Sequence, residues 1–545
     1  MNARSSPPKT IVEALAASAP AEDRPIASLI ERLGRLGDAG LRGARQDGRA
    51  IGAAALGGLP VRGISADSRR VGPGDIFVAV PGEHVDGHDF VAAAAAAGAV
   101  AAIVERPLPE VGLAQLVVGR STRALASAAA WWYGDPSHEL AVVGVTGTDG
   151  KTTTSFLAVA ALEAAGVSTG LIGTIDTKVG PVREANAEHV TTPGAPELQA
   201  LLRAMVANGD EGAVVETTSH GLALERVAEV AYDAAILTNL THEHLELHGT
   251  FEAYRAAKLS LFERLAAPGT GSTRPRVGIV NRDDPSAAIF EAVVRESGAR
   301  LLTYGSDPSA TVHATRVVED ASRLRVRYAA PSGEADLELR LAGRFNVHNA
   351  LAVVALGEAW ELDPAAVRKG LESMPGVPGR MERVEAGQPF GVIVDYAHTP
   401  ASLGGVLDLL APLAAARGGG LIAVFGSAGE RDTAKRPLMG RLAAERCRLV
   451  IVTDEDPRGE DRETILDEIA RGAEGAGARR DRDLLVIADR RAAIGAAIER
   501  AKPGDVVLLA GKGHEQSIIG PDGPVPWDER GAALAALADR GYEGS

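Results

Sequence analysis

The stretch AVVGVTGTDGKTTT, residues 141–154, predicts a strand, a tight turn and a helix in succession. The valines at its start are typical of a buried strand, and Gly147 and Gly150 indicate a turn that only small residues tolerate. The helix is expected to begin at Lys151. Such a turn directs backbone N–H groups and a helix N-terminus at one point, which favours an anion there.

The residues after the turn extend this interpretation from an anion to a nucleotide phosphate. Lys151 supplies a mobile positive charge, and the Thr152 hydroxyl can reach a Mg²⁺ held by the phosphates. The spacing departs from the usual G-x-x-x-x-G-K pattern, because Val145 stands where that pattern has glycine. An ordinary strand-to-helix turn is the alternative. The coincidence of both glycines, the lysine and the threonine argues against it.

The composition describes a globular protein of several domains. Its 545 residues are too many for a single core and suggest about three or four domains. Hydrophobic residues make up 46% and charged residues 24%, an ordinary globular balance. The formal net charge of −15 argues against a general nucleic-acid binder, whereas an anionic small molecule can still bind in a local basic cleft.

Three features of the chain indicate a cytoplasmic location without membrane insertion. The single cysteine, Cys447, allows no internal disulfide and fits a reducing compartment. The longest apolar run, from Phe90 to Val104, is shorter than the roughly 18 residues that a membrane span needs. The N-terminal residues carry charges and lack a signal-peptide core.

The region before residue 139 is predicted to hold an extension and a small α/β domain. Residues 1–58 are interpreted as a partly disordered extension, with a linker over residues 40–58 and one amphipathic helix before it. Over residues 59–138, strands alternate with helices, which is typical of an open, mostly parallel sheet. The loop 82–87 follows one of these strands, and ligands bind at such strand ends.

A central domain is expected over residues 139–371, with polar side chains at successive strand ends. Glu216 ends a second buried strand, and His244 follows a third. An acid and an imidazole beside a phosphate loop suit a Mg²⁺–nucleotide site, so we predict that both side chains bind the metal.

Other polar residues of the central domain are more ambiguous. Lys258 lies in a helix predicted over residues 251–265, where a solvated lysine is the simplest interpretation. Residues 312–342 alternate as antiparallel strands. Asn346 and Asn349 share one face of the next predicted helix, where their amides suit a base edge, with helix capping as the alternative.

The last domain, residues 372–545, begins at a hinge predicted over PGVPGRMER, residues 375–383. Four strands follow, and each ends in a polar, glycine-containing or acidic loop. These loops are YAHTP, GSAGERD, TDEDPR and GKGHE. The pattern predicts a doubly wound, Rossmann-like sheet with its site at the carboxyl ends of the strands.

Taken together, these stretches resemble the Mur ligases, the ATP-dependent amide-bond synthetases of peptidoglycan assembly. Motifs shared across that family are TGTDGKTTT, TNLTHEHLELHGT, GRFNVHNALA, PGRMERV and VDYAHTP. The stretches SADSRRVGPGDIFVAVPG, EAYRAAKLSLF, VFGSAGERDTAKRPLMG, TDEDPRGEDR and GKGHEQ are similar to its MurE branch. The resemblance implies an α/β fold of three domains: a small N-terminal domain for the UDP-sugar, a central P-loop ATPase-like domain and a C-terminal Rossmann-like domain for an amino acid.

The resemblance also implies that ATP and Mg²⁺ are needed and which residues contact them. The implied ATP contacts are Gly147, Thr148, Asp149, Gly150, Lys151, Thr152, Thr153, Asn346 and Asn349. The implied metal ligands are Thr152, Glu216, His244 and Lys258, the last as a carbamate (N6-carboxylysine). The implied catalytic residues are Lys151, Glu216, His244, Lys258, Arg380 and Asp395.

Two further sets are implied for the substrates. The UDP-sugar would contact Ala66, Ser68, Glu83, His84, Val85, Thr191, Thr192, Thr218 and Arg226. The amino acid would contact Arg431, Glu455, Asp456, Pro457, Arg458, Gly511 and Glu515.

The activity that the resemblance implies is addition of meso-2,6-diaminopimelate to the D-Glu of UDP-MurNAc-L-Ala-D-Glu through an acyl phosphate, by a monomer. The family motif D-N-P-R is here Glu455-Asp456-Pro457-Arg458. Aspartate accepts hydrogen bonds but cannot donate them, so L-lysine or L-ornithine stays open as the added amino acid. A ligase for folate or D-Ala-D-Ala and a non-catalytic nucleotide-binding switch or scaffold are the remaining alternatives.

Overall fold

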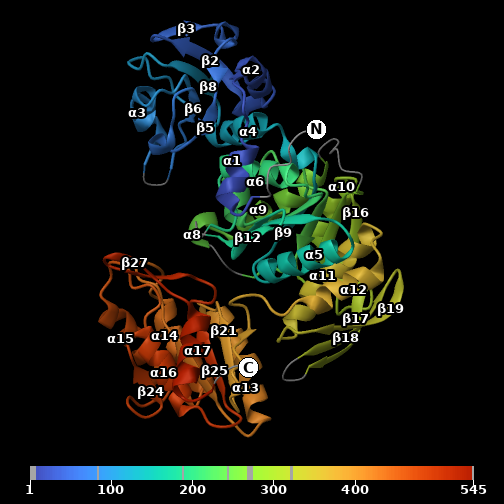
Figure 1. Cartoon of the computed structure of the whole chain (residues 1–545), viewed down its shortest axis with the longest axis vertical. Helices are drawn as coiled ribbons and strands as arrows, with labels where there is room; N and C mark the ends of the chain where they lie inside the picture. The colour runs from blue at the N-terminus through green and yellow to red at the C-terminus, as the bar shows by residue number, and fades with distance from the viewer. Residues whose placement is uncertain are drawn as a thin grey trace. The chain divides into compact units, whose positions relative to one another are not determined.

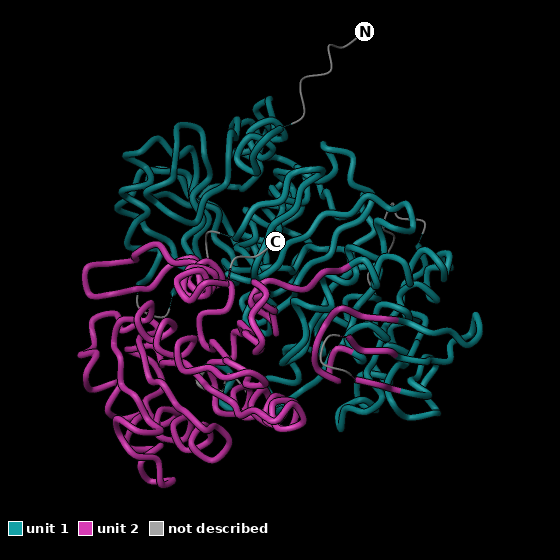
Figure 2. Tube along the Cα trace, turned by 60° about the horizontal axis from the view of Figure 1, so that its bottom comes forward, with its two compact units in different colours: residues 1–316, 326–337, 347–373 teal, residues 317–325, 338–346, 374–545 magenta. Residues whose placement is uncertain are grey.

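The computed structural model describes residues 8–82, 85–186, 190–241, 245–266, 274–319 and 323–542. The chain divides into two compact units (Figure 2). The first comprises residues 1–316, 326–337 and 347–373, and the second comprises residues 317–325, 338–346 and 374–545. The region predicted as the N-terminal domain belongs to the first unit, and so does the region predicted as the central domain except for residues 317–325 and 338–346.

The described residues of the N-terminal region form a six-stranded sheet in the order β3-β2-β8-β7-β6-β5 (Figure 1). Its strands are β2 (Leu41–Gln46), β3 (Arg49–Ile51), β5 (Gly63–Ser65), β6 (Asp75–Val78), β7 (Ala101–Val104) and β8 (Ala114–Val118). Strands β5 to β8 pair in parallel, as predicted, whereas β2 pairs antiparallel with β8. A short pair, β1 (Arg24–Pro25) and β4 (Pro60–Val61), accompanies the helices α2 (Ala27–Gly34), α3 (Val91–Ala96) and α4 (Ser121–Tyr133).

The prediction of a partly disordered extension over residues 1–58 is wrong for most of that range. Helix α1 (Ile11–Ser18) forms where disorder was expected, and the supposed linker contains β2 and β3. Leu29 and Leu33 of α2 are buried in the same core as Trp131 of α4. The glycine-rich composition of residues 40–58 concealed two short strands: β2 pairs with β8, which is distant in sequence, and β3 pairs in turn with β2.

The central region forms an eleven-stranded sheet among the described residues, in the order β12-β11-β10-β13-β9-β14-β15-β16-β17-β18-β19. Its parallel strands are β9 (Ala141–Thr146), β10 (Thr169–Ile172), β13 (Gly212–Glu216), β14 (Ala234–Leu237), β15 (Val277–Asn281) and β16 (Arg300–Gly305). The outer strands are β11 (Asp176–Val179), β12 (Val182–Ala185), β17 (Val312–Glu319), β18 (Leu324–Ala330) and β19 (Gly333–Leu339). The three strands predicted to hold the site, β9, β13 and β14, are neighbours at its centre.

Helices flank this central sheet. They are α5 (Lys151–Ala164), α6 (Ala195–Ala207), α7 (Ser219–Ala223), α8 (Leu245–His248), α9 (Phe251–Glu263), α10 (Ala287–Glu296), α11 (Phe345–Ala359) and α12 (Pro364–Ser373). Leu202 of α6, Phe262 of α9 and Phe290 of α10 share one buried cluster with Val142 of β9 and Val215 of β13. Because the central strands run parallel, their carboxyl ends meet at one edge of the sheet.

The second unit contains the predicted doubly wound sheet, in the order β20-β21-β25-β22-β23-β24. The strands are β20 (Glu382–Arg383), β21 (Gly391–Asp395), β22 (Leu421–Phe425), β23 (Leu449–Val452), β24 (Leu484–Val486) and β25 (Val506–Ala510). One core packs α13 (Pro400–Ala415), α14 (Lys435–Arg446) and α15 (Arg462–Gly475) against the sheet, and a second packs α16 (Arg490–Arg500) and α17 (Glu529–Asp539). A hairpin of β26 (Ser517–Gly520) and β27 (Gly523–Pro526) precedes α17.

None of the described helices combines the length and the apolar character that a membrane span requires.

Candidate active site

The phosphate loop forms between β9 and α5, as predicted. Gly147 and Gly150 adopt positive φ angles of 146° and 81°, which disfavour any other residue. A Cβ atom at Gly147 would lie only 1.9 Å from the Thr238 hydroxyl, so glycine is required there for a second reason. Lys151 Nζ donates to the carbonyl oxygens of Gly147 at 3.0 Å and Thr148 at 2.7 Å, which keeps its positive charge beside the loop.

The loop after β14 fixes the shape of the phosphate loop. Thr148 N–H donates to the Asn239 carbonyl oxygen at 2.7 Å, and Asp149 N–H donates to the Asn239 side-chain oxygen at 3.0 Å. The Thr238 hydroxyl donates to the Asp149 carbonyl oxygen at 2.6 Å. The loop is therefore held in place by neighbouring residues of the same sheet edge, so binding a phosphate costs little ordering entropy.

Glu216 ends β13 and is completely buried beside the first turn of α5. Its carboxylate accepts hydrogen bonds from the Thr152 hydroxyl at 3.1 Å and from the Thr174 hydroxyl at 2.8 Å. Burial raises the pKa of Glu216, against the opposing effect of these hydroxyl donors and of the Lys151 charge. The hydroxyl and carboxylate oxygens form a donor set that suits Mg²⁺.

Thr174 was missed by sequence reasoning. It follows β10, a strand that the sequence analysis did not predict, and its N–H also donates to Glu216 at 3.2 Å. Among the described residues, no group of three or more His, Cys, Asp and Glu side chains is placed to hold a metal ion. The predicted ligand His244 lies outside the described residues.

Lys258 is buried, so its interpretation as a solvated helix lysine is wrong. The side chain is on α9 and the residue is 1% exposed. Its Nζ donates to the Gly147 carbonyl oxygen at 2.7 Å and lies 4.6 Å from the centre of the Tyr254 ring. A lysine at this depth is expensive to bury, which favours a role at the phosphate loop.

Threonines predicted for the UDP-sugar lie next to Glu216. The Thr192 hydroxyl donates to the Glu216 carbonyl oxygen at 2.7 Å and lies 3.0 Å from the Thr218 hydroxyl. The Thr191 hydroxyl lies 3.0 Å from that of Thr174. Arg226 donates to the Thr192 carbonyl oxygen at 2.8 Å, and burial lowers the pKa of this arginine.

The other residues predicted for the UDP-sugar belong to the N-terminal region of the chain. Ala66 and Ser68 follow β5, and Val85 lies in the loop after β6 with 57% of its surface exposed. Glu83 and His84 lie outside the described residues. The role of all five residues stays a prediction.

Asn346 and Asn349 are both buried on the first turns of α11. Asn346 Nδ2 donates to the Ala342 carbonyl oxygen at 2.6 Å, a local contact to the segment that precedes the helix. The Asn349 side-chain oxygen accepts from the Thr154 hydroxyl at 3.3 Å and would lie 2.5 Å from a Cβ atom at Gly150. Asn349 is thereby placed beside the phosphate loop.

In the second unit, Asp395 ends β21 and is buried. Its carboxylate accepts the N–H groups of Met381 and Ala397, each at 2.8 Å. Burial raises the pKa of Asp395, and the nearby charge of Arg380 opposes this. The Arg380 guanidinium lies 4.7 Å from the centre of the Tyr396 ring. Arg380 and Asp395 are therefore neighbours, and their catalytic roles stay a prediction.

Most residues predicted for the amino acid gather at the carboxyl ends of β22, β23 and β25. Gly429 N–H donates to the Asp456 carbonyl oxygen at 2.8 Å, which joins the loops after β22 and β23. The Glu455 carboxylate would lie 3.0 Å from a Cβ atom at Gly511, after β25. Arg458 has a φ of 55°, a strained conformation for arginine. Arg431 is exposed, two residues beyond Gly429.

Some buried polar atoms at this edge have no hydrogen-bond partner within the described part of the chain. They are Ser427 Oγ, Glu455 Oε2 and Arg458 Nε. A buried acceptor on an acid and a buried donor on a guanidinium, in one loop, are complementary to the ammonium and carboxylate of an amino acid.

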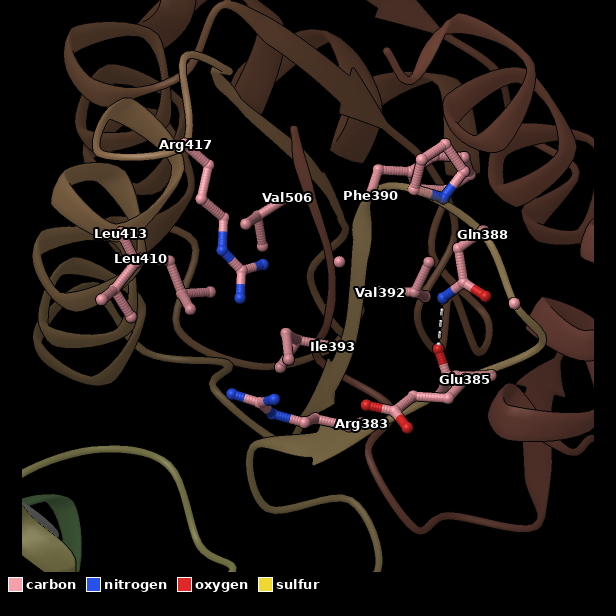
Figure 3. Close-up of a pocket in the computed structure, with 14 residues that line it drawn as sticks. Arg383, Glu385, Gln388, Phe390, Val392, Ile393, Leu410, Leu413, Arg417 and Val506 are labelled. Atoms are coloured by element: carbon pink, nitrogen blue, oxygen red, sulfur yellow. Dashed lines mark hydrogen bonds between the residues drawn. The ribbon is translucent and has the colours of Figure 1, made fainter. Parts of the chain in front are cut away.

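A cavity of about 420 Å³ lies elsewhere in the second unit (Figure 3). Its lining includes Arg383, Ile393, Leu410, Arg417 and Val506. Strands β21 and β25 begin here, so the cavity lies at the amino ends of the parallel strands. The residues predicted for the amino acid lie at the opposite edge, and the cavity is therefore separate from the candidate active site.

A buried arginine holds the loop after β22. Arg436 is completely buried and donates to the Glu460 carboxylate at 2.7 and 2.8 Å. Glu430 N–H donates to the same carboxylate at 2.9 Å. The Arg436 hydrogen bonds, with a smaller contribution from Glu430 N–H, lower the pKa of Glu460 to about 2.

This carboxylate is expected to make stability depend on pH. Its folded-state pKa lies below the ordinary value of 4.5, so its stabilisation is complete above that pH and is lost as the pH falls toward 2. Glu460→Gln should lower the free energy of unfolding by about 1 kcal/mol near pH 7 and by roughly half of that near pH 3. Urea unfolding at several pH values measures this, with the exposed Glu463→Gln as control; an equal loss at both pH values would contradict it.

Comparisons with known proteins identify the family. Models of three domains match: the Mur ligase family catalytic domain over residues 60–131, the Mur ligase middle domain over residues 145–357 and the Mur ligase glutamate ligase domain over residues 379–513. A UDP-N-acetylmuramyl-tripeptide synthetase from Roseiflexus sp. (strain RS-1) is 49% identical over 491 residues, which are 89% of this chain and 96% of the relative. This chain belongs to the Mur ligase family.

Other Mur ligase relatives are named for a specific amino acid. The UDP-N-acetylmuramoyl-L-alanyl-D-glutamate–2,6-diaminopimelate ligase of Geobacter metallireducens is 39% identical over 89% of this chain and 96% of the relative. A solved structure of a ligase with the same name is 30% identical and has a TM-score of 0.62, covering 88% of this chain and 95% of that one. The predicted family and three-domain α/β architecture are thus confirmed.

Proposed function

We propose that this Mur ligase adds meso-2,6-diaminopimelate to the D-Glu of UDP-MurNAc-L-Ala-D-Glu, with ATP as the energy source. The reaction would be a step of peptidoglycan precursor synthesis in the cytoplasm, carried out by a monomer. The proposal is carried by the phosphate loop bordered by Glu216 and Lys258, in a chain whose relatives span 89% of its length.

In the proposed reaction, the loop N–H groups and Lys151 bind the ATP phosphates. The side-chain carboxylate of D-Glu attacks the γ-phosphorus, ADP leaves, and an acyl phosphate forms. The amine of the incoming amino acid then attacks the acyl carbon through a tetrahedral intermediate. The amine loses a proton, phosphate leaves with one oxygen of the original carboxylate, and an amide remains.

Thr152 and Glu216 would hold Mg²⁺ through their hydroxyl and carboxylate oxygens, together with His244 and the carbamate of Lys258. Bound Mg²⁺ neutralises negative charge on the transferred phosphoryl group. The N–H groups of Thr148 and Asp149 donate to Asn239 and thereby hold the phosphate loop in shape. Asn349 contacts helix α5, which follows that loop. Arg380 and Asp395 are proposed to take part in catalysis.

For the amino acid, Glu455 would accept from an ammonium group and Arg458 would bind a carboxylate with two parallel hydrogen bonds. Diaminopimelate has a second carboxylate, which lysine and ornithine lack. Arg458 is therefore the residue expected to distinguish diaminopimelate from these two amino acids.

The proposal is tested by incubating the protein with ATP, Mg²⁺, UDP-MurNAc-L-Ala-D-Glu and one of three amino acids. We expect phosphate release with meso-diaminopimelate to exceed that with L-lysine or L-ornithine by at least about a hundredfold in kcat/KM, because the latter two leave the buried Nε of the Arg458 guanidinium unpaired. Equal or greater rates with lysine would reject the diaminopimelate assignment. No phosphate with any of the three would reject the ligase activity.

A further inference from the structure

Two loops of the candidate amino-acid site are joined by a buried lysine. Lys512 follows β25, and only 1% of its side chain is exposed. Its Nζ lies 2.8 Å from Asp456 Oδ1, in the loop after β23, and also contacts the Glu515 carboxylate. A buried ammonium needs such counter-charges, because no water replaces them.

The Asp456 carboxylate is thus already engaged by the protein. The same oxygen, Oδ1, accepts the Ile519 N–H at 2.9 Å. The Ile519 carbonyl oxygen in turn accepts the Arg458 N–H at 2.9 Å. These contacts attach the hairpin β26–β27 to the loop after β23. They use the backbone of Arg458 and leave its guanidinium as the cation of that loop.

The charge balance of this cluster bears on the choice of amino acid. An isolated aspartate at 456 would favour a substrate ammonium, such as the side chain of lysine or ornithine. With Lys512 in contact, Asp456 carries no uncompensated charge, and the one net negative charge of the Asp456–Lys512–Glu515 cluster is left on Glu515. A substrate ammonium would also meet the fixed Lys512 ammonium at the same carboxylate, and like charges repel.

We propose that Lys512 is a positioning residue of the amino-acid site: it neutralises Asp456, holds Glu515 in the same cluster, and leaves Arg458 to select the amino acid. This inference rests on the proposed function. Removing Lys512 leaves the buried Asp456 carboxylate and the half-buried Glu515 carboxylate without their shared counter-charge, whereas removing the charge of Asp456 as well relieves that conflict. The effects of substituting Lys512 and Asp456 should therefore be strongly non-additive.

The experiment measures KM and kcat of four variants with diaminopimelate and lysine. Lys512→Met should raise the KM for diaminopimelate by about thirtyfold and change the KM for ATP by less than about twofold. Asp456→Asn should keep the preference for diaminopimelate over lysine, with a rise in KM of about threefold. Lys512→Met/Asp456→Asn should recover most of the loss, and Lys512→Arg should recover part of it through its conserved charge. The exposed Lys502→Met is the matched control.

A change in the preference of Asp456→Asn between diaminopimelate and lysine, in either direction, would overturn the inference. An unchanged KM for diaminopimelate in Lys512→Met would also overturn it, as would a double variant whose KM for diaminopimelate is no lower than that of Lys512→Met. A wild-type protein that ligates none of the amino acids would instead reject the proposed function. In that case urea unfolding of the same variants tests the charge coupling between Lys512 and Asp456. Losses of stability that add up in the double variant would contradict the coupling, whereas a double variant more stable than Lys512→Met would support it.

Discussion

Lys258→Ala is expected to lower the turnover number by about a thousandfold, the effect of removing a charged group from a transferring phosphoryl site. Lys258 is buried, and its Nζ donates to the Gly147 carbonyl oxygen at 2.7 Å. In the proposed active form this nitrogen carries a carbamate that binds Mg²⁺ beside Glu216. The alanine variant loses that ligand while the phosphate loop keeps its contacts to Asn239.

A small carboxylate should replace the lost carbamate. Formate or acetate is expected to raise the activity of Lys258→Ala by about tenfold, because the deleted side chain leaves room for an anion of that size. The exposed Lys369→Ala on α12 is the control and should keep wild-type activity with or without the additive. Full activity of Lys258→Ala without an additive would contradict the carbamate.

Arg490→Met is expected to lower the free energy of unfolding by about 3–5 kcal/mol, the cost of leaving a buried charge without its partner. Arg490 and Glu529 are both completely buried, with Nη2 and Oε1 2.6 Å apart. The Arg490 guanidinium also donates to the carbonyl oxygens of Asp454 at 2.9 Å and Ala510 at 2.7 Å. It therefore ties together the carboxyl ends of β23 and β25, whose loops carry the proposed amino-acid site.

Urea unfolding measures this loss. The neighbouring Arg491→Met is the matched control, because Arg491 is exposed and should lose less than about 1 kcal/mol. The double variant Arg490→Met/Glu529→Leu should be more stable than Arg490→Met, since both buried charges are gone. A loss for Arg490→Met as small as that of Arg491→Met would contradict a buried charge pair.

The elements with local signals were predictable from the sequence. Strand β9, the turn at Gly147 and Gly150, and helix α5 follow from side-chain size and the backbone freedom of glycine. The parallel sheet of the second unit follows from apolar runs that end in polar loops. Strand β2 was not predictable in this way, because it pairs with β8, which is distant in sequence, and β3 pairs in turn with β2.

The candidate site was predictable where a motif marks it and not where burial decides the chemistry. Glu216 was expected at a strand end, but Thr174, which donates to it, carries no motif. The burial of Lys258 depends on how α9 packs against the sheet, which its own helical periodicity does not reveal. The Asp456–Lys512 contact joins residues 56 apart in sequence, so the pairing of the Asp456 carboxylate with an ammonium group emerges only from the fold.

The most direct test of the account follows oxygen from the acceptor to phosphate. UDP-MurNAc-L-Ala-D-Glu is prepared with ¹⁸O in the side-chain carboxylate of D-Glu and is incubated with the protein, ATP, Mg²⁺ and meso-diaminopimelate. Mass spectrometry of the products should show one ¹⁸O in each released phosphate and an amide-linked diaminopimelate in the nucleotide product. Phosphate released without ¹⁸O would contradict an acyl-phosphate ligase.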